Sequence, residues 1–184
     1  MENYYISKVT SDLGGINIIP VISFVGLSGC GKTTYLTKLV AEMKRRGYKL
    51  AVIKHDAHSF DIDHPGKDTW QHAEAGADVV CISSPQKMAL IKKTVPELTL
   101  LEILQHINDV DIIFTEGYKS EGKIKIEVFR KTAYDKPVCH QEELLAIVSD
   151  DIIYEGLPRF SLLDPAPIAD FLEEKFLIKH RTQQ

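Results

Sequence analysis

The sequence predicts an α/β fold, a three-layer sandwich built around a mainly parallel sheet. Short apolar runs rich in β-branched residues recur along the 184 residues, as expected of buried strands. Stretches with apolar residues at helical spacing lie between several of these runs. Because a strand, a helix and a second strand in succession form a crossover unit, this alternation favours parallel pairing.

The first crossover unit shows the pattern most clearly. Residues 21–25 are an apolar run ended by Gly26, which predicts a buried strand. A helix follows, with a basic last turn and a glycine stop at residues 44–47. Residues 50–53 are the second strand. The apolar stripe of the helix consists of Leu36, Leu39, Val40 and Met43.

The remaining elements are expected further along the chain. Residues 55–66 form a polar loop that ends at Pro65 and Gly66, and Thr99 with Glu102 forms a capping box that opens a helix. Residues 124–128 alternate apolar and charged side chains, which is typical of a half-buried edge strand. We also expect a short helix with Trp70, Ala73 and Ala77, strands at 79–82, 88–91, 110–114 and 145–148, and a closing helix after Asp164.

Composition excludes several classes of protein. The formal net charge is −4, so the chain lacks the basic excess of a general nucleic-acid binder. No run reaches the roughly 18 apolar residues of a membrane helix, and the amino terminus does not resemble a signal peptide. The three cysteines are odd in number and far apart, which fits a reducing compartment. We therefore expect a cytoplasmic protein that binds neither nucleic acid nor membrane.

Residues 26–33, Gly-Leu-Ser-Gly-Cys-Gly-Lys-Thr, match the complete pattern of a phosphate-binding loop, or P-loop. The pattern lies after a strand and before a helix, where its backbone N–H groups and the helix dipole would attract phosphate. Lys32 would reach the β- and γ-phosphates in a catalytic role, and the Thr33 hydroxyl would bind Mg²⁺. The predicted nucleotide-binding residues here are Gly26, Ser28, Gly29, Cys30, Gly31, Lys32, Thr33 and Thr34.

The motif defines the expected domain organisation. A P-loop NTPase-like domain is expected over residues 20–178. An extension of unknown role at residues 1–19 precedes it, and a polar tail at residues 179–184 follows it.

Two acidic residues are candidates for catalysis and for metal binding. Glu116 lies just beyond the apolar strand predicted at 110–114, at the carboxyl edge where parallel sheets bind ligands. Asp56 follows the second strand and competes for the same role of holding the metal or positioning water. Asp111 lies near the start of its strand and is the weaker candidate.

The polar loop that follows the second strand also invites a metal-site hypothesis. It contains three histidines and three aspartates, but their spacing matches no specific zinc pattern and no cysteine pair supports them. A polar loop over the phosphate site is the simpler interpretation. These residues are His55, His58, His64, Asp56, Asp61 and Asp63.

Several motifs in the same order resemble the MobB family of molybdopterin-guanine dinucleotide biosynthesis adaptors, over residues 20–150. The resemblance is carried by the P-loop, Ile53-Lys54-His55-Asp56, Asp63-His64-Pro65-Gly66-Lys67-Asp68 and Glu116-Gly117-Tyr118-Lys119. The family stretch of the Asp-Pro-Gly-Lys-Asp type here contains the additional His64.

The resemblance implies a GTP-binding, dimeric protein that needs Mg²⁺ and is at most a slow GTPase. It implies partnership with MobA, the guanylyltransferase that attaches GMP to molybdopterin, and molybdopterin itself is a further candidate partner. It also places Lys67 in a loop that contacts phosphate or a partner.

The residues themselves leave the choice of base open. The Asn-Lys-x-Asp guanine reader is absent, but Asp150 follows a strand and could accept hydrogen bonds from guanine N1 and N2. An acid at a loop end with no ligand is the plainer interpretation of Asp150.

Three functions follow from these observations. The first is a GTP-binding adaptor that assists the guanylyltransferase of molybdenum cofactor maturation. The second is a P-loop small-molecule kinase, in which Asp56 or Glu116 positions the acceptor hydroxyl. The third is a metal-insertion GTPase that uses the polar loop.

Overall fold

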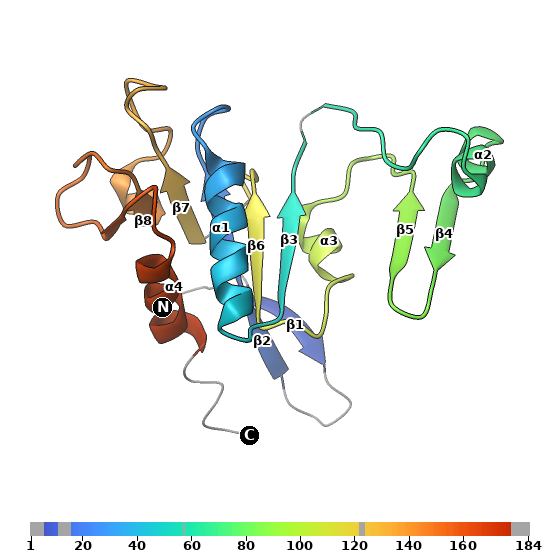
Figure 1. Cartoon of the computed structure of the whole chain (residues 1–184), viewed down its shortest axis with the longest axis horizontal. Coiled ribbons are helices and arrows are strands. Elements are labelled where there is room, and N and C mark those ends of the chain that lie inside the picture. The colour runs from blue at the N-terminus through green and yellow to red at the C-terminus, as the bar shows by residue number, and fades with distance from the viewer. Residues whose placement is uncertain (1–5, 11–15, 57, 122–123, 178–184) are drawn as a thin grey trace. The chain divides into compact units, whose positions relative to one another are not determined.

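The computed structural model describes residues 6–10, 16–56, 58–121 and 124–177 (Figure 1). The chain divides into two compact units. The main unit comprises Met1–His55 and Leu100–Gln184, and the smaller unit comprises Asp56–Thr99.

The main unit contains a sheet with the strand order β3-β6-β2-β7-β8-β9. Each neighbouring pair in this order is parallel, which confirms the predicted α/β fold class. In the central register, Ile22 of β2 lies opposite Phe114 of β6 on one side and Ile124 of β7 on the other. The strands are β2 (Ile16–Val25), β3 (Leu50–Lys54), β6 (Ile112–Glu116), β7 (Ile124–Val128), β8 (Leu144–Val148) and β9 (Arg159–Phe160).

Helices cover both faces of this sheet. Successive side chains of a strand point to opposite faces, so Ile22 packs in the core beneath α1 (Lys32–Arg45) and α4 (Ala166–Leu172), whereas Val21 packs in the core with α3 (Leu100–Leu104). Figure 1 shows α1 lying across the face of the central strands. Its predicted stripe is confirmed, because Leu36, Leu39 and Met43 are buried.

Short helical turns complete the main unit. A 3₁₀ turn at Gln141–Glu143 leads into β8, and a π-helical turn at Glu173–Leu177 continues α4. Within the described part of the chain, no helix has the length and apolar character required to cross a membrane.

Part of the expected amino-terminal extension forms strands. β1 (Ile6–Thr10) pairs antiparallel with Ile16–Pro20, so β2 begins at Ile16 and not at Val21 as predicted. Pairing of β2 with β6 begins at Val21 and pairing with β7 begins at Ile22, so the missing N–H of Pro20 interrupts neither parallel ladder. Residues 1–5, 11–15 and the predicted tail at 179–184 lie outside the described residues.

The expectation that residues 124–128 form an edge strand is wrong. β7 lies between β2 and β8, and its last three residues are buried. Glu127 is only 1% exposed, yet its carboxylate accepts backbone N–H groups of Val138 at 2.7 Å and Cys139 at 3.1 Å. Such bonds allow a charged residue to occupy an interior strand, so the alternating pattern did not indicate an edge.

The smaller unit consists of one short helix and a hairpin, α2 (Asp68–Glu74), β4 (Val79–Ser83) and β5 (Met88–Lys92). The strands pair antiparallel with Ser83 opposite Met88, and both lie where strands were expected, at 79–82 and 88–91. Among the described residues of this unit, Val80 is the one hydrophobic residue that is buried. The helix α2 has no buried side chain.

Candidate functional site

Residues 26–33, hereafter the glycine loop, connect β2 to the start of α1. Gly26, Gly29 and Gly31 all have positive φ angles, of 142°, 80° and 97°. Residues with a Cβ rarely adopt this conformation, so the glycines allow the chain to turn sharply before the helix. At Gly26 the contact is also tight, because a Cβ would lie 2.5 Å from the Val128 carbonyl oxygen.

The ammonium group of Lys32 is bonded to the loop that precedes it. Its Nζ donates to the carbonyl oxygen of Gly26 at 3.0 Å and to that of Leu27 at 2.8 Å. The lysine therefore closes the glycine loop on itself. A phosphate would have to compete with these two carbonyl groups for the ammonium group.

Thr33 and Glu116 meet beside the loop. β6 pairs with β2 so that Glu116 lies opposite Phe24, at the carboxyl ends of both strands. The Thr33 hydroxyl donates to Glu116 Oε1 at 2.6 Å, and the Lys54 ammonium lies 3.9 Å from the same oxygen. Hydroxyl and carboxylate oxygens are the donors that Mg²⁺ prefers, so these residues fit a magnesium ion chemically.

The turn after Glu116 is tightly built. Tyr118 has a φ of 52°, which is uncommon for a residue with a side chain. Its ring lies 4.9 Å from the His55 ring, and the His55 N–H donates to the Glu116 carbonyl oxygen at 2.9 Å. A Cβ on Gly117 would lie 3.1 Å from that of His55. These contacts hold the Glu116 backbone in place.

Asp56, Lys67 and Asp150 were also predicted to belong to the site. Asp56 and Lys67 belong to the smaller unit, so their roles in the site stay predictions. Asp56 Oδ1 accepts the His58 N–H at 3.1 Å. Asp150 follows β8, and its Oδ1 accepts the Leu162 N–H and the Ser161 hydroxyl, both at 3.0 Å. These bonds connect the loop after β8 to the loop after β9. The contact of Asp150 with guanine stays a prediction.

The remaining residues predicted to bind nucleotide differ in their exposure to solvent. The Cys30 side chain is 1% exposed and packs in the main core, whereas Ser28 is exposed and its carbonyl oxygen accepts a hydrogen bond from the Tyr134 hydroxyl. Thr34 is exposed on the first turn of α1. Across the described ranges, no group of three histidine, cysteine, aspartate or glutamate side chains is arranged to hold a metal ion.

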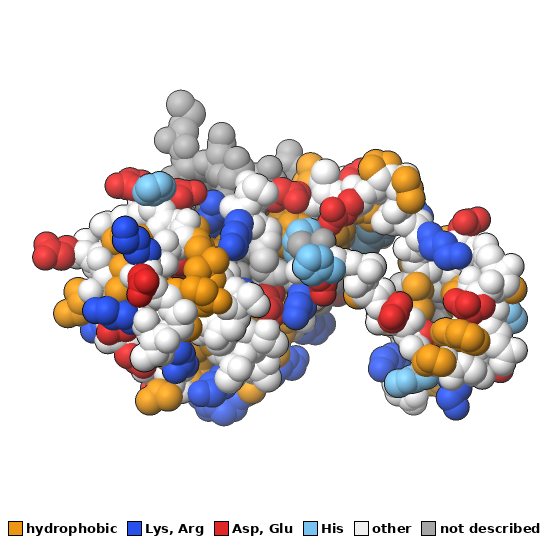
Figure 2. Space-filling view, turned by 90° about the horizontal axis from the view of Figure 1, so that it is seen from above, with side chains coloured by type: hydrophobic (Ala, Val, Ile, Leu, Met, Phe, Trp, Pro, Cys, Tyr) orange, Lys and Arg blue, Asp and Glu red, His pale blue; other side chains and the backbone are white. Residues whose placement is uncertain are grey.

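Two residues beside the loop were not predicted. Tyr134 contacts Ser28, and a Cβ on Gly31 would lie 3.8 Å from Arg130 Nη2. Both belong to the segment after β7, which flanks β2 on the side opposite β6. Figure 2 looks onto the edge at which the parallel strands end and shows basic and acidic side chains close together there. An arginine just after an apolar strand was the available sequence signal, but it becomes informative only once the strand order is known.

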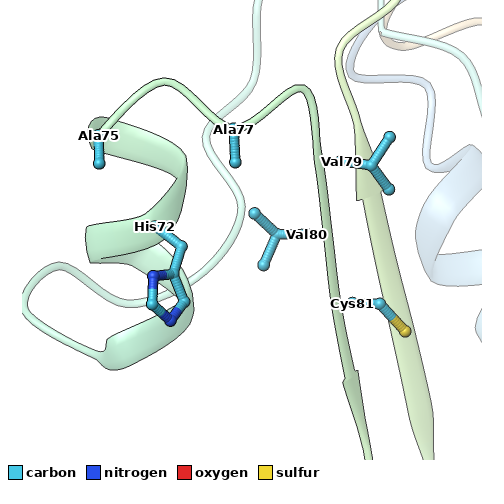
Figure 3. A pocket seen from close by; sticks show the side chains of 6 residues that line it. All are labelled: His72, Ala75, Ala77, Val79, Val80 and Cys81. Carbon is cyan, nitrogen blue, oxygen red and sulfur yellow. The ribbon is translucent and has the colours of Figure 1, made fainter.

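A separate shallow pocket of about 470 Å³ lies within the smaller unit (Figure 3). His72 of α2 and Val80 of β4 lie on its two sides. Its lining contains no lysine or arginine, so it differs in chemistry from the glycine loop. The lining residues are His72, Ala75, Ala77, Val79, Val80 and Cys81.

The sheet order and the glycine loop define the class: an α/β protein whose mostly parallel sheet carries a P-loop sequence at its carboxyl edge. The family model of MobB, molybdopterin guanine dinucleotide synthesis protein B, matches residues 21–150. The chain belongs to the MobB family.

Curated relatives agree with this assignment. The chain is 33% identical over 168 residues to the molybdopterin-guanine dinucleotide biosynthesis adapter protein of Escherichia coli K12, covering 88% of this chain and 96% of that protein. It is 32% identical over 160 residues to the adapter protein of Haemophilus influenzae, covering 85% and 89%.

Solved structures show the same fold. A crystal structure of molybdopterin-guanine biosynthesis protein B superposes with a TM-score of 0.62 at 28% identity, covering 84% of this chain and 98% of the other. Bacillus subtilis MobB superposes with a TM-score of 0.67 at 25% identity, covering 86% and 98%.

Proposed function

We propose that this protein is a GTP-binding adaptor of molybdenum cofactor maturation that assists a MobA-like guanylyltransferase in the cytoplasm. Membership of the MobB family and the names of the adapter proteins that it resembles support the pathway. The observation that carries nucleotide binding is the 2.6 Å bond between Thr33 and Glu116 at the end of the glycine loop. It joins the two groups that a nucleotide-bound metal requires.

Each residue of the loop has a distinct role in this proposal. Backbone N–H groups of the glycine loop bind phosphate oxygens, and Lys32 exchanges the carbonyl groups of Gly26 and Leu27 for the β- and γ-phosphates. Thr33 and Glu116 hold Mg²⁺, which neutralises phosphate charge when bound. Any GTP hydrolysis is slow, and the protein acts chiefly through its nucleotide state.

The nucleotide state acts by ordering nearby segments. The γ-phosphate and its metal can hold loops that hydrolysis releases, and such changes control partner binding in many nucleotide switches. We propose a homodimer as the acting form, with the guanylyltransferase as the partner and molybdopterin as a further candidate ligand.

The test is reconstitution of guanine dinucleotide cofactor assembly at limiting GTP. The guanylyltransferase is assayed alone, with wild-type protein, with Lys32→Ala or with Lys38→Ala. Lys38 is an exposed lysine of the same helix, outside the loop. We expect wild type and Lys38→Ala to raise product yield and Lys32→Ala to have no effect. Equal stimulation by all three proteins, or by none, would overturn the proposed coupling.

A further inference from the structure

The glycine loop has chemically different neighbours on its two sides. β6 and β7 flank β2, so Glu116 lies on one side of the loop and the segment that follows β7 lies on the other. Arg130 is the second residue after β7 ends. The loop thus lies between a carboxylate and a guanidinium group.

Two contacts place the segment 130–134 against the glycine loop. A Cβ on Gly31 would lie 3.8 Å from Arg130 Nη2, and a Cβ on Gly29 would lie 3.8 Å from the Tyr134 hydroxyl. That hydroxyl donates to the Ser28 carbonyl oxygen. Arg130 therefore lies next to the residue that directly precedes Lys32.

The backbone of this segment is held at both ends. The Phe129 N–H donates to the Val148 carbonyl oxygen at 2.9 Å, and the Arg130 carbonyl oxygen accepts the N–H groups of Ala133 and Tyr134 at 3.0 and 3.1 Å. Further on, the buried Glu127 carboxylate accepts the N–H groups of residues 138 and 139. The position of Arg130 is therefore set by the backbone, independently of any partner for its side chain.

The Arg130 guanidinium is exposed and has no hydrogen-bond or ion-pair partner among the residues that the structure describes. It lies beside Gly31 at the amino terminus of α1, and both this terminus and the next residue, Lys32, contribute positive potential. Because like charges repel, this arrangement becomes favourable when an anion binds between them. Lys32, in contrast, already has two carbonyl partners.

We propose that Arg130 binds the terminal phosphate of a nucleoside triphosphate on the glycine loop and makes the site prefer triphosphates to diphosphates. This inference rests on the proposed nucleotide binding. The lysine of a P-loop reaches the β- and γ-phosphates, and Arg130 lies against the residue directly before it, so it faces the same end of the phosphate chain. A planar guanidinium matches two phosphate oxygens at once.

The test is titration calorimetry with GTP, GDP, ATP and ADP in the presence of Mg²⁺. Wild type is compared with Arg130→Ala, Lys32→Ala and Arg45→Ala. Arg45 supplies the control, because it is an exposed arginine at the other end of α1, about 20 Å away at 1.5 Å per residue. Unfolding temperatures show whether each variant is folded.

We expect Arg130→Ala to weaken triphosphate binding by about ten- to hundredfold, the range for a hydrogen bond to a charged group. Diphosphate binding should change little, and Arg45→Ala should bind every nucleotide as wild type does. An equal loss of affinity for triphosphates and diphosphates, or no loss of affinity, would overturn the role of Arg130. Lys32→Ala separately tests whether the glycine loop binds nucleotide. A wild-type protein that binds no nucleotide would overturn the proposed function and this inference with it.

Discussion

At Gly26 two constraints coincide at a single residue. Its φ is 142°, and the place of a Cβ lies 2.5 Å from a backbone oxygen of β7. Gly47, after α1, has a φ of 91° but nothing within 4 Å of its Cβ position. The two glycines therefore separate the cost of backbone strain from the cost of a steric clash.

We expect Gly26→Ala to lower the free energy of unfolding by about 3 kcal/mol or more, because strain and overpacking add. Gly47→Ala should cost about 1 kcal/mol, since only the backbone strain applies. Urea denaturation of both variants measures the difference. Similar losses at the two positions would show that the Val128 oxygen moves aside.

Among the helices, α1 is tied to α4 and the turn after it by one arginine. Arg46 is 14% exposed, and its guanidinium bonds Glu42 at 2.8 Å and Asp170 at 2.6 Å and also bonds Glu173. Arg45 is 72% exposed and, among the residues that the structure describes, pairs with Glu42. Because desolvated charge networks contribute more than exposed pairs, the two neighbouring arginines differ in their expected importance.

We expect Arg46→Ala to lower the free energy of unfolding by about 1.5–3 kcal/mol, because it removes charge-assisted hydrogen bonds to the partly buried carboxylates of Glu42 and Glu173. Arg45→Ala should leave it nearly unchanged, because exposed ion pairs contribute little. Chemical denaturation of the two variants gives both values. A loss for Arg45→Ala as large as that for Arg46→Ala would contradict the importance of the bridge between the helices.

Within β7, burial raises the pKa of the Glu127 carboxyl above its ordinary value, although the N–H groups of Val138 and Cys139 lower it. The folded protein therefore keeps this proton to a higher pH than the unfolded chain does. Between the two pKa values the folded state binds more protons, so stability falls as pH rises through that window. Above the window the loss is constant.

Glu127→Gln removes this titration. We expect the unfolding free energy of wild type, relative to the variant, to fall as pH rises above the ordinary carboxyl pKa and then to level off. Urea unfolding at several pH values between about 4 and 7 measures the difference. A difference that rises with pH would show that the two hydrogen bonds outweigh burial.

At the scale of the whole molecule, the two units bury apolar side chains very unequally. The three core clusters described in the structure belong entirely to the main unit. In the smaller unit Val80 is buried, while Val79, Ile82, Met88 and Leu90 are each about half exposed or more. Segments with few buried contacts open locally at a lower free energy than the global unfolding.

We therefore expect backbone amides of β4 and β5 to exchange with deuterium much faster than those of β6. Hydrogen-exchange mass spectrometry measures this at a protein concentration where sedimentation shows a monomer, because a second copy could cover the exposed side chains. Equal protection of β5 and β6 in the monomer would contradict the expected difference in stability.

Local patterns in the sequence were sufficient for much of the fold and for part of the candidate site. The glycine loop and the stripe of Leu36, Leu39 and Met43 depend on neighbours a few residues apart, so spacing alone predicts a strand, a loop and a helix. The family motifs were visible for the same reason. Glu116 was singled out because it ends an apolar strand.

The tertiary structure alone decided which strands are neighbours. Pairing of β7 with β2 and β8 makes it an interior strand, buries Glu127 and brings Arg130 to the loop, about 100 residues after Gly31. It also decided that residues 56–99 form a unit of their own, which holds Asp56 and Lys67. Periodicity indicates which face of a helix or strand is apolar, whereas the identity of the neighbouring element depends on long-range packing. Spacing along the chain was therefore enough to predict the glycine loop, but not the residues that surround it.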